Sequence, residues 1–430
     1  MSYKKICSKI SKKKIKIGII GMGYVGLPLA KSFVEKKIQT YGFDIDKIKI
    51  QKLNKGISYI NYFKNIEIKK MISKNFIPTT NFKLISSMDL IILCLPTPIK
   101  KNKTPEMFYI LNSLKMIFPY LKTNQTLSLE STTYPGTCDE LIAPILKKKF
   151  ILGENFHLIY SPEREDPGNK KYSLLKIPKV IGGYTNKCRK IGEKFYGLLN
   201  IKLISVNNIK TAEFTKLLEN IYRSVNIGII NEMNHICKKL NINIFEAIEA
   251  AGTKPFGFQK FYPGPGYGGH CIPIDPFLLS WKAKQKGAKT EFIELSGKIN
   301  EKIPAKISNK VFNFCKKAKI KKVIIIGVAY KKNVDDLRES PSLRIIDKLS
   351  KKKLQVSYYD PFIKQLPATR EFKIQKKNIK LNKNILKNSV IVIVTDHDQI
   401  NYNFIKKNSK FIFDCRGRYK KNYPGKILQL

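Results

Sequence analysis

The pattern of hydrophobic positions changes character twice along the chain. Its first half contains short apolar runs at residues 15–20, 39–43, 90–95, 126–129, 158–160, 179–181 and 203–206. Such runs are typical of strands that are buried on both faces of a parallel sheet. Helical stretches separate them, and strands that alternate with helices indicate a doubly wound α/β domain. We therefore expect residues 1–210 to form one such domain.

Residues 211–318 follow a helical pattern instead. Residues 211–240 contain no proline and a single glycine, Gly228, while residues 291–319 are interrupted only by Pro304. A periodic pattern this long usually bridges domains or forms an oligomer interface. We interpret the region as a helical connector whose two long helices flank a loop.

Strand signals resume in residues 319–430. They lie at residues 322–328, 354–359, 389–395 and 411–413. The turn after the first of them reads GVAYKKN and lacks the spaced glycines of a dinucleotide site. The predicted fold class is therefore α/β, with two Rossmann-like doubly wound domains joined by a long central helix.

Composition and charge narrow the function classes. The net charge is +49, from 81 Lys and Arg against 32 Asp and Glu. Such a charge suits nucleic-acid binding through counterion release, but it also suits lysines spread over solvated faces. The lysines are scattered and no nucleic-acid motif accompanies them, so we favour the second interpretation and expect no specific nucleic-acid partner.

The sequence gives no sign of a membrane or metal protein. No apolar run reaches the length of a membrane span, and the basic N-terminus lacks the features of a signal peptide. We expect no membrane association and a cytoplasmic location. The eight cysteines form no CxxC pair and only four histidines are present. We therefore expect neither a disulfide framework nor a metal site.

A dinucleotide-binding signature follows the first predicted strand. Gly21, Gly23 and Gly26 form GMGYVG, with Tyr24 and Val25 between them, and Asp44 ends the second strand. The glycines would allow a tight turn, close approach to a pyrophosphate, and helix–strand packing. Asp44 would accept hydrogen bonds from a ribose hydroxyl and repel a 2′-phosphate, which favours NAD over NADP. A plain strand-terminal aspartate is the alternative.

A second chemical signal lies in the loop FYPGPGYGGHCIPIDP, residues 261–276. Its prolines make a regular helix through this stretch improbable. Cys271 on such a loop, four residues before Asp275, is placed for covalent chemistry, although a buried structural thiol is the alternative. A cofactor together with a thiol suggests an oxidation that continues past the aldehyde.

Seven motifs in order identify a resemblance. GMGYVGLPLA, LCLPTP, ESTTYPGT, SPEREDPGN, EFTKLLENIYR, GGHCIPIDP and DDLRESPS together resemble the UDP-glucose/GDP-mannose dehydrogenase superfamily, from about residue 15 to residue 416. The forms SPEREDPGN and PGPGYGGHCIPIDP are most similar to the branch that acts on UDP-N-acetylhexosamines, above all UDP-N-acetylglucosamine.

The resemblance implies an architecture and a reaction. Residues 1–210 would bind NAD, residues 211–318 would connect, dimerise and carry the cysteine loop, and residues 319–430 would bind UDP. Such enzymes oxidise the C6 alcohol of a nucleotide sugar to a carboxylate with two NAD⁺, through a cysteine thioester. The expected partners are a UDP-sugar and further copies of the chain, as a homodimer or larger homo-oligomer. The expected product is a precursor of cell-surface polysaccharide.

The resemblance also assigns catalytic roles. Cys271 would be the nucleophile, and Lys216 and Asn220 would donate to a developing oxyanion. Asp275 would orient a water that takes the alcohol proton, beside Lys216 and Thr132. Glu163 would be the base for thioester hydrolysis. By spacing alone, Lys216 and Asn220 belong to a solvated helix stripe, and Glu163 to the surface.

The binding residues follow from the same motifs. Pro96 and Thr97 would contact the ribose and pyrophosphate of NAD, with Ser131 and Thr132 nearer the nicotinamide and Arg338 at the closed active site. The expected substrate-binding residues are Glu165, Arg223, Phe261, Tyr262, Gly264, Gly268 and Lys331.

Some positions depart from the family pattern. Val334 stands where many members have threonine, and Asp414-Cys415-Arg416-Gly417 replaces a more usual Asp-Thr-Arg-Asn. The arginine found before the cysteine in UDP-glucose enzymes is not evident, and Lys260 is the residue that could replace it. UDP-glucose, UDP-N-acetylmannosamine, UDP-N-acetylgalactosamine and GDP-mannose stay open as substrates. A binding protein without catalysis and a two-electron dehydrogenase of the 3-hydroxyacyl or 6-phosphogluconate type are further alternatives.

Overall fold

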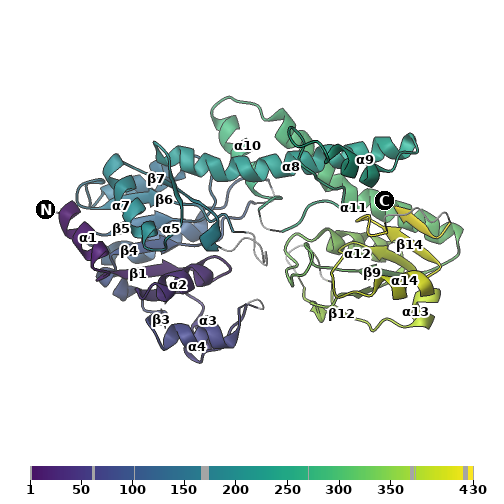
Figure 1. The fold of residues 1–430 in the computed structure, drawn as a ribbon, viewed down its shortest axis with the longest axis horizontal. Helices are drawn as coiled ribbons and strands as arrows, with labels where there is room; N and C mark the ends of the chain where they lie inside the picture. The colour runs from purple at the N-terminus through teal and green to yellow at the C-terminus, as the bar shows by residue number, and fades with distance from the viewer. Residues whose placement is uncertain are drawn as a thin grey trace. The chain divides into compact units, whose positions relative to one another are not determined.

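The structure, a computed structural model, describes residues 2–60, 63–100, 102–165, 174–269, 271–368, 372, 374–419 and 425–429. The end of the SPEREDPGN motif, residues 166–169, and His270 lie outside the described residues. The chain divides into two compact units (Figure 1). The first unit is Met1–Glu219 with Phe277–Ala288, and the second is Asn220–Pro276 with Lys289–Leu430.

The first unit is built on an eight-stranded sheet with the order β3-β2-β1-β4-β5-β6-β7-β8. The strands are β1 Lys16–Ile20, β2 Gln39–Phe43, β3 Phe76–Thr79, β4 Leu90–Leu93, β5 Thr126–Leu129, β6 His157–Tyr160, β7 Lys179–Gly183 and β8 Leu203–Ser205. Neighbouring strands are parallel except β6 and β7. The order 3-2-1-4-5-6 is that of dinucleotide-binding Rossmann folds.

Helices connect these strands. They are α1 Ser2–Ser11, α2 Gly26–Glu35, α3 Lys47–Asn54, α4 Asn65–Ile72, α5 Phe108–Ile117, α6 Ala143–Lys147 and α7 Asn186–Gly197, with a π-helical turn, η3 Cys138–Ile142, before α6. The apolar faces of α2 and α7 join β1 and β4 in one core cluster. Burying the apolar strands between helices is what the continuous runs in the sequence require.

The predicted strands of the first unit are all present, with ends that differ by one or two residues. The sequence pattern did not predict two elements of the first unit, β3 and α1. The strand β3 has Pro78 and alternating burial, and it lies at the edge of the sheet, so it produces no continuous apolar run. The helix α1 lies in a lysine-rich segment, and Ile6 and Ile10, with Cys7 packed beside them, join it to the core.

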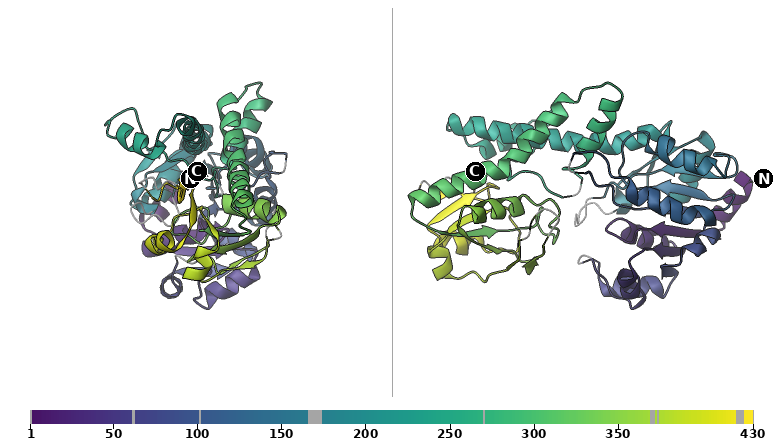
Figure 2. Two further views of the ribbon diagram at one scale, coloured as in Figure 1. Left: turned by 90° about the vertical axis from the view of Figure 1, so that its right-hand side faces the viewer. Right: turned by 180° about the vertical axis from the view of Figure 1, so that it is seen from behind.

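The second unit begins within α8 Ile209–Lys239, which starts in the first unit. It continues with α9 Ile244–Ala251 and α11 Glu291–Lys317. The amide of Asn231 on α8 donates to Asn300 on α11 at 2.8 Å, and Ser296 donates to the carbonyl of Ser224 at 3.1 Å. These buried bonds hold the two long helices against each other, and Figure 2 shows the ribbons of α8 and α11 close together.

The prolines near Cys271 have the predicted effect with one addition. The described residues between Phe261 and Ile274 contain no helix, but α10 Asp275–Gln285 begins at the end of the loop. Pro276 lies in its first turn, where the missing N–H breaks no helical hydrogen bond. The helix itself belongs to the first unit from Phe277 onward.

The second sheet has the order β10-β9-β13-β14-β15, and its strands are all parallel. They are β9 Lys322–Ile326, β10 Gln355–Tyr359, β13 Val390–Ile393, β14 Phe411–Asp414 and β15 Ile427–Gln429, with a small hairpin of β11 Gln365–Leu366 and β12 Lys376–Lys377. The helices α12 Pro341–Lys351, α13 Lys383–Lys387 and α14 Tyr402–Asn408 complete the unit.

Two apolar clusters pack against the sheet of this unit. One joins α11 and α12 to the sheet, and the other joins α13 and α14 to it. The order reverses between β9 and β13, and ligands of such folds bind at the carboxyl ends of the strands at this point. The predicted fold class, two doubly wound Rossmann-like domains and a long central helix, is confirmed.

Candidate active site

The turn between β1 and α2 fits a dinucleotide. Gly21 has φ +96°, and a Cβ there would lie 2.3 Å from the carbonyl oxygen of Cys94. A Cβ on Gly26 would lie 2.0 Å from the carbonyl oxygen of Gly21. A Cβ on Gly23 would meet no described atom within 4 Å. Two glycines are thus needed by the fold, while the third leaves open space where a pyrophosphate would approach.

The carboxylate of Asp44 supports this turn from the end of β2. One oxygen accepts from the backbone N–H of Met22 at 3.0 Å, and the other from Asp46 at 3.0 Å. The ammonium of Lys49 lies 3.6 Å away. A carboxylate offers about four acceptor positions, so Asp44 keeps capacity for a ribose hydroxyl. Tyr24 and Val25 line the same turn, half-buried.

The loops after β4 and β5 meet beside this turn. The hydroxyl of Thr97 donates to the carbonyl of Thr132 at 2.6 Å. The hydroxyl of Ser131 accepts from the N–H of Leu95 at 2.9 Å. Thr97 and Ser131 are buried, and Pro96 is exposed. The structure therefore brings together the four residues that the motifs assign to the ribose, pyrophosphate and nicotinamide.

Glu213 fixes the loop that carries Thr132, and sequence reasoning gave it no role. Its carboxylate, on α8, accepts from the N–H of Gly136 at 2.5 Å and of Cys138 at 2.9 Å. Burial raises the pKa of Glu213 to about 7, although these hydrogen bonds oppose the shift. Lys216, one turn further along α8, is only 8% exposed. The only signal for Glu213 was its place in the EFTKLLENIYR motif.

The helix α10 packs on the same loop. The rings of Trp281 and Tyr134 are 4.8 Å apart between centroids, and Lys282 forms an ion pair with Glu140. Lys282 is buried, so its ammonium depends on that carboxylate. The segment that directly follows the cysteine loop is thereby anchored to ESTTYPGT.

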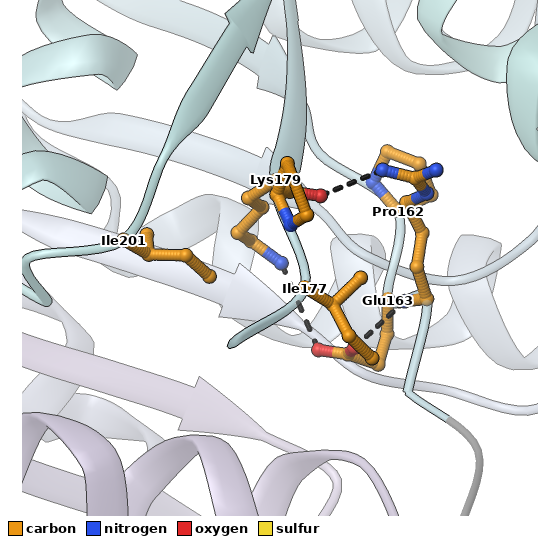
Figure 3. Close-up of a pocket in the computed structure, with 7 residues that line it drawn as sticks. Pro162, Glu163, Ile177, Lys179 and Ile201 are labelled. Carbon is orange, nitrogen blue, oxygen red and sulfur yellow. Dashed lines mark hydrogen bonds and ion pairs between the residues drawn. The ribbon is translucent and has the colours of Figure 1, made fainter. Parts of the chain in front are cut away.

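Glu163 lies in the loop after β6 (Figure 3). One of its oxygens accepts from the N–H groups of Arg164 at 2.6 Å and Glu165 at 2.7 Å. The other lies 3.7 Å from the ammonium of Lys179. Its side chain is 12% exposed, so it is not a carboxylate of the open surface. Glu165 is half-buried.

In the second unit, Cys271, Asp275 and Asn220 come together. The carbonyl of Cys271 accepts from the N–H of Asp275 at 2.8 Å, which starts α10. The carboxylate of Asp275 accepts from the amide of Asn220 at 2.5 Å, and both side chains are buried. The predicted polar stripe of α8 is thus solvated only at Arg223, which is exposed, whereas Lys216 and Asn220 are buried.

Contacts with neighbouring elements hold the loop before Cys271 along its length. Phe261 packs edge-on against Tyr222 at 5.9 Å, and the hydroxyl of Tyr262 donates to Glu249 at 2.7 Å. The N–H of Gly264 donates to Asn231 at 3.0 Å. Further along the loop, a Cβ on Gly268 would lie 2.8 Å from the Cβ of Tyr330. The N–H of Gly269 donates to the carbonyl of Arg338 at 2.9 Å.

Basic residues surround the carboxyl ends of the second sheet. Arg416 follows β14, donates to the carbonyl of Val394 at 2.7 Å, and has Nη1 2.9 Å from the position of a Cβ on Gly264. Lys331 is half-buried in the turn after β9, and Arg338 forms an ion pair with Asp336 at 2.6 Å. The departure at Asp414-Cys415-Arg416-Gly417 therefore keeps the arginine beside the glycine loop.

The other departures from the family pattern are Lys260 and Val334. Lys260 pairs with Glu249 on α9 at 2.6 Å, and Val334 is half-buried in the turn after β9. Among the described residues, no group of three His, Cys, Asp or Glu side chains is arranged to hold a metal ion. In the same part of the chain, every helix is too short or too polar to cross a bilayer.

Comparisons with known proteins identify the family. Three family models match: the NAD-binding domain of the UDP-glucose/GDP-mannose dehydrogenase family over residues 15–200, its central domain over 210–302 and its UDP-binding domain over 324–421. The chain belongs to the UDP-glucose/GDP-mannose dehydrogenase family. NAD is therefore its cofactor, as Gly21, Gly23 and Asp44 predicted.

Its relatives are divided by substrate. The chain is 34% identical to a UDP-N-acetyl-D-mannosamine dehydrogenase of Methanocaldococcus jannaschii, over 94% of this chain and 91% of that protein. It is 32% identical to a UDP-N-acetyl-D-glucosamine 6-dehydrogenase of Pseudomonas aeruginosa, over 84% and 86%. A solved UDP-D-ManNAc dehydrogenase from Pyrococcus horikoshii has a TM-score of 0.86 at 28% identity, covering 96% of this chain and 98% of that one.

Proposed function

We propose that this chain oxidises the C6 alcohol of a UDP-N-acetylhexosamine, UDP-N-acetylglucosamine first among them, to the uronic acid by removing four electrons. The observation that carries the proposal is Cys271 on the turn into α10, with Asp275 tied to Asn220 at 2.5 Å. A cysteine whose backbone is bonded to a residue of a buried polar pair is held firmly enough to offer its thiol for covalent catalysis at a carbonyl carbon. The product would serve cell-surface polysaccharide synthesis in the cytoplasm.

UDP-N-acetylmannosamine is the second candidate substrate. Several relatives, including those from Methanocaldococcus jannaschii and Pyrococcus horikoshii, carry that substrate in their names. The two sugars differ only in configuration at C2, far from the oxidised carbon. UDP-glucose, UDP-N-acetylgalactosamine and GDP-mannose are further alternatives within the family.

Bound NAD⁺ would accept a hydride from the substrate carbon at each of the two oxidations. Gly21, Gly23, Gly26 and Asp44 would hold it through the turn and the N-terminus of α2, which has no side-chain cap. Lys216 and Asn220 would donate to the substrate oxygen as it gains negative charge. Asp275 would orient the water that removes the alcohol proton, with Thr132 beside Lys216.

Cys271 and Glu163 would divide the later chemistry. The sulfur of Cys271 would add to the aldehyde carbon, forming a C–S bond, while the thiol proton passes to the aldehyde oxygen. This adduct would then lose a hydride to a second NAD⁺ and its hydroxyl proton to water, which leaves a thioester. Glu163 then takes a proton from water while the water oxygen bonds to the carbonyl carbon. The C–S bond breaks, and Cys271 leaves as a thiolate. Arg338, Lys331, Glu165 and Arg223 would hold the substrate around this centre.

The first test is NADH yield across UDP-GlcNAc, UDP-ManNAc, UDP-GalNAc, UDP-glucose and GDP-mannose. We expect two NADH per sugar, with the highest kcat/KM for UDP-GlcNAc. One NADH per sugar would contradict the four-electron reaction. A higher kcat/KM for UDP-ManNAc would establish the second candidate instead.

Cys271→Ser should lower acid release by about 10³-fold or more, because no thioester can form. Cys237→Ser, at another half-buried cysteine of the second unit, is the matched control and should keep full yield. Glu163→Gln should accumulate the thioester, which intact-mass spectrometry detects as a covalent adduct. Full acid release by Cys271→Ser would contradict the mechanism.

We also propose that the chain forms a homodimer through α8. Its exposed apolar side chains recur at intervals of three, four or seven residues: Phe214, Leu218, Tyr222, Ile229, Met233 and Ile236, with Leu240 directly after the helix. Such a stripe on one helix face is what a partner helix would cover. Leu218→Glu should convert a dimer into a monomer by light scattering, and a wild-type monomer would contradict the proposal.

A further inference from the structure

Glu163 stands above a buried cluster of charges that the mechanism does not use. Lys179, the first residue of β7, is 3% exposed, and its ammonium lies 2.7 Å from Glu130 and 3.7 Å from Glu163. Figure 3 shows the Lys179 side chain extending toward the Glu163 carboxylate. An ammonium in such a place needs both a charge partner and hydrogen bonds.

Glu130 directly follows β5 and is buried more deeply than Glu163. Its second oxygen accepts from the hydroxyl of Tyr196 at 2.5 Å, and Tyr196 also shares a 2.8 Å hydrogen bond with Ser128. Burial raises the pKa of Glu130, and the ammonium of Lys179 opposes that shift. Glu130 and Glu163 therefore compete for the same ammonium.

The two oxygens of Glu163 have different surroundings. The first is fixed by the two backbone N–H groups of Arg164 and Glu165. The second accepts no hydrogen bond from the described residues and has Lys179 as its ion-pair partner. This second oxygen can therefore accept a hydrogen bond from a water molecule. The charged group beside it is the ammonium of Lys179.

We propose that Lys179 is a positioning residue for Glu163, and that Glu130 controls how much of the Lys179 charge reaches that carboxylate. The inference rests on the proposed role of Glu163 as the base of thioester hydrolysis. An ammonium within about 4–6 Å of a carboxylate favours its ionised, base-competent form, and a second carboxylate on the same ammonium weakens that effect.

Other charged groups face the loop but do not replace Lys179. Arg164 turns away from Glu163, because its guanidinium donates to the carbonyl of Pro178 at 2.7 Å and pairs with Glu219 at 2.5 Å. The thiol of Cys94 lies in the field of Glu130, Lys179 and Glu163, and burial raises its pKa well above the usual range, which keeps it neutral.

The experiment measures thioester hydrolysis in single turnovers across pH, following loss of the covalent adduct by intact mass. Lys179→Met should move the acid limb of the rate profile to higher pH by about one unit, a tenfold slower rate on that limb. Glu130→Gln should move the limb to lower pH, because Lys179 then serves Glu163 alone. Lys179→Arg keeps the charge and should keep the wild-type limb.

Controls separate this role from a structural one. Lys31→Met breaks the 2.5 Å pair with Glu67 between α2 and α4 and should leave the limb unchanged. If Lys179→Met does not fold, the double variant with Glu130→Gln removes one charge of each sign, and its limb should return toward that of the wild type. Limbs that stay in place, or that move in the same direction in both single variants, overturn the inference.

Glu163→Gln distinguishes the inference from the function on which it rests. Slow hydrolysis in Glu163→Gln with unshifted Lys179 and Glu130 variants removes only the positioning role. Wild-type hydrolysis in Glu163→Gln removes Glu163 from the mechanism and the positioning role with it. A lower melting temperature of Lys179→Met without any shift of the acid limb would mean that Lys179 contributes to stability alone.

Discussion

The two Rossmann-like units build the same turn for different purposes. In the first, the N–H of Gly21 donates to the carbonyl of Phe43 at 2.8 Å, and in the second, the N–H of Gly327 donates to that of Tyr359 at 2.8 Å. A Cβ on Gly21 would clash with Cys94, and one on Gly327 with Thr395 at 2.0 Å. Both turns therefore need their first glycine for the approach of the neighbouring strand.

The aspartates that follow the second strand of each unit differ in how many of their acceptor positions remain available. Asp44 has accepted two backbone hydrogen bonds and has one lysine beside it. Asp360 accepts from four backbone N–H groups, of Val328, Ala329, Phe362 and Ile363, and lies 3.0 Å from the ring of His397. Its acceptor positions are filled, so it cannot take a ribose.

The glycine pattern changes together with the aspartate. The second unit has Ala329 where the first has Gly23, and its turn lacks a counterpart of Gly26. One unit thus leaves its aspartate available to a ligand, while in the other the backbone and His397 occupy the corresponding carboxylate. A shared fold therefore determines where a ligand can approach, and a few residues determine which ligand does so.

The largest effect should come from Asp360→Ala. Removing an acceptor of four buried N–H groups and one histidine should lower the free energy of unfolding by about 3 kcal/mol or more. Thermal melting and urea titration measure it. Asp44→Ala, whose site faces a ligand, is the matched control and should cost less. Equal losses of unfolding free energy in the two variants would contradict this difference between the two aspartates.

Substitution of Asp360 should also change how stability depends on pH. Burial alone would raise the pKa of Asp360, but the hydrogen bond from His397 and the backbone donors outweigh it and hold the pKa below its usual range. This stabilisation is present above the pKa of an unfolded aspartate, about 3.9, and is lost as pH falls through the lower folded value. Asp360→Asn should flatten the acid side of the stability profile.

Gly23→Ala should have the next effect. The added methyl group meets no described atom, so the protein should fold normally, yet the methyl occupies the space of the pyrophosphate. We expect NAD affinity to fall by about tenfold or more, or about 1.4 kcal/mol, by isothermal titration calorimetry. Ala329→Gly, at the corresponding position of the second unit, should leave NAD affinity unchanged. An unchanged affinity in Gly23→Ala would place NAD elsewhere.

Asp44→Ala should have the smallest effect on total binding and a specific effect on selectivity. Without the carboxylate, the 2′-phosphate of NADP is no longer repelled, so the NAD/NADP preference should fall by about tenfold. Steady-state kinetics with both cofactors measures it. The preference should survive in Asp46→Ala, which removes the neighbouring carboxylate. An unchanged preference in Asp44→Ala would contradict its role.

Sequence reasoning succeeded where the signal is local. The continuous apolar strands, the spaced glycines of Gly21 and Gly23 and the prolines around Cys271 each depend on a few adjacent residues. The buried charges could not be found in this way. Lys179 is one of many lysines, and only the pairing of β6 with β7 places it beside Glu163. Glu130 and His397 likewise depend on partners far along the chain.

The contact between Trp281 and Tyr134 has a practical consequence. The chain contains one tryptophan, so the whole indole emission of the protein originates at the ESTTYPGT loop, where Thr132 lies. Light absorbed at the long-wavelength edge of the protein spectrum therefore reports on a single location. This natural optical probe needs no label, and reduced nicotinamide bound within energy-transfer range would quench it.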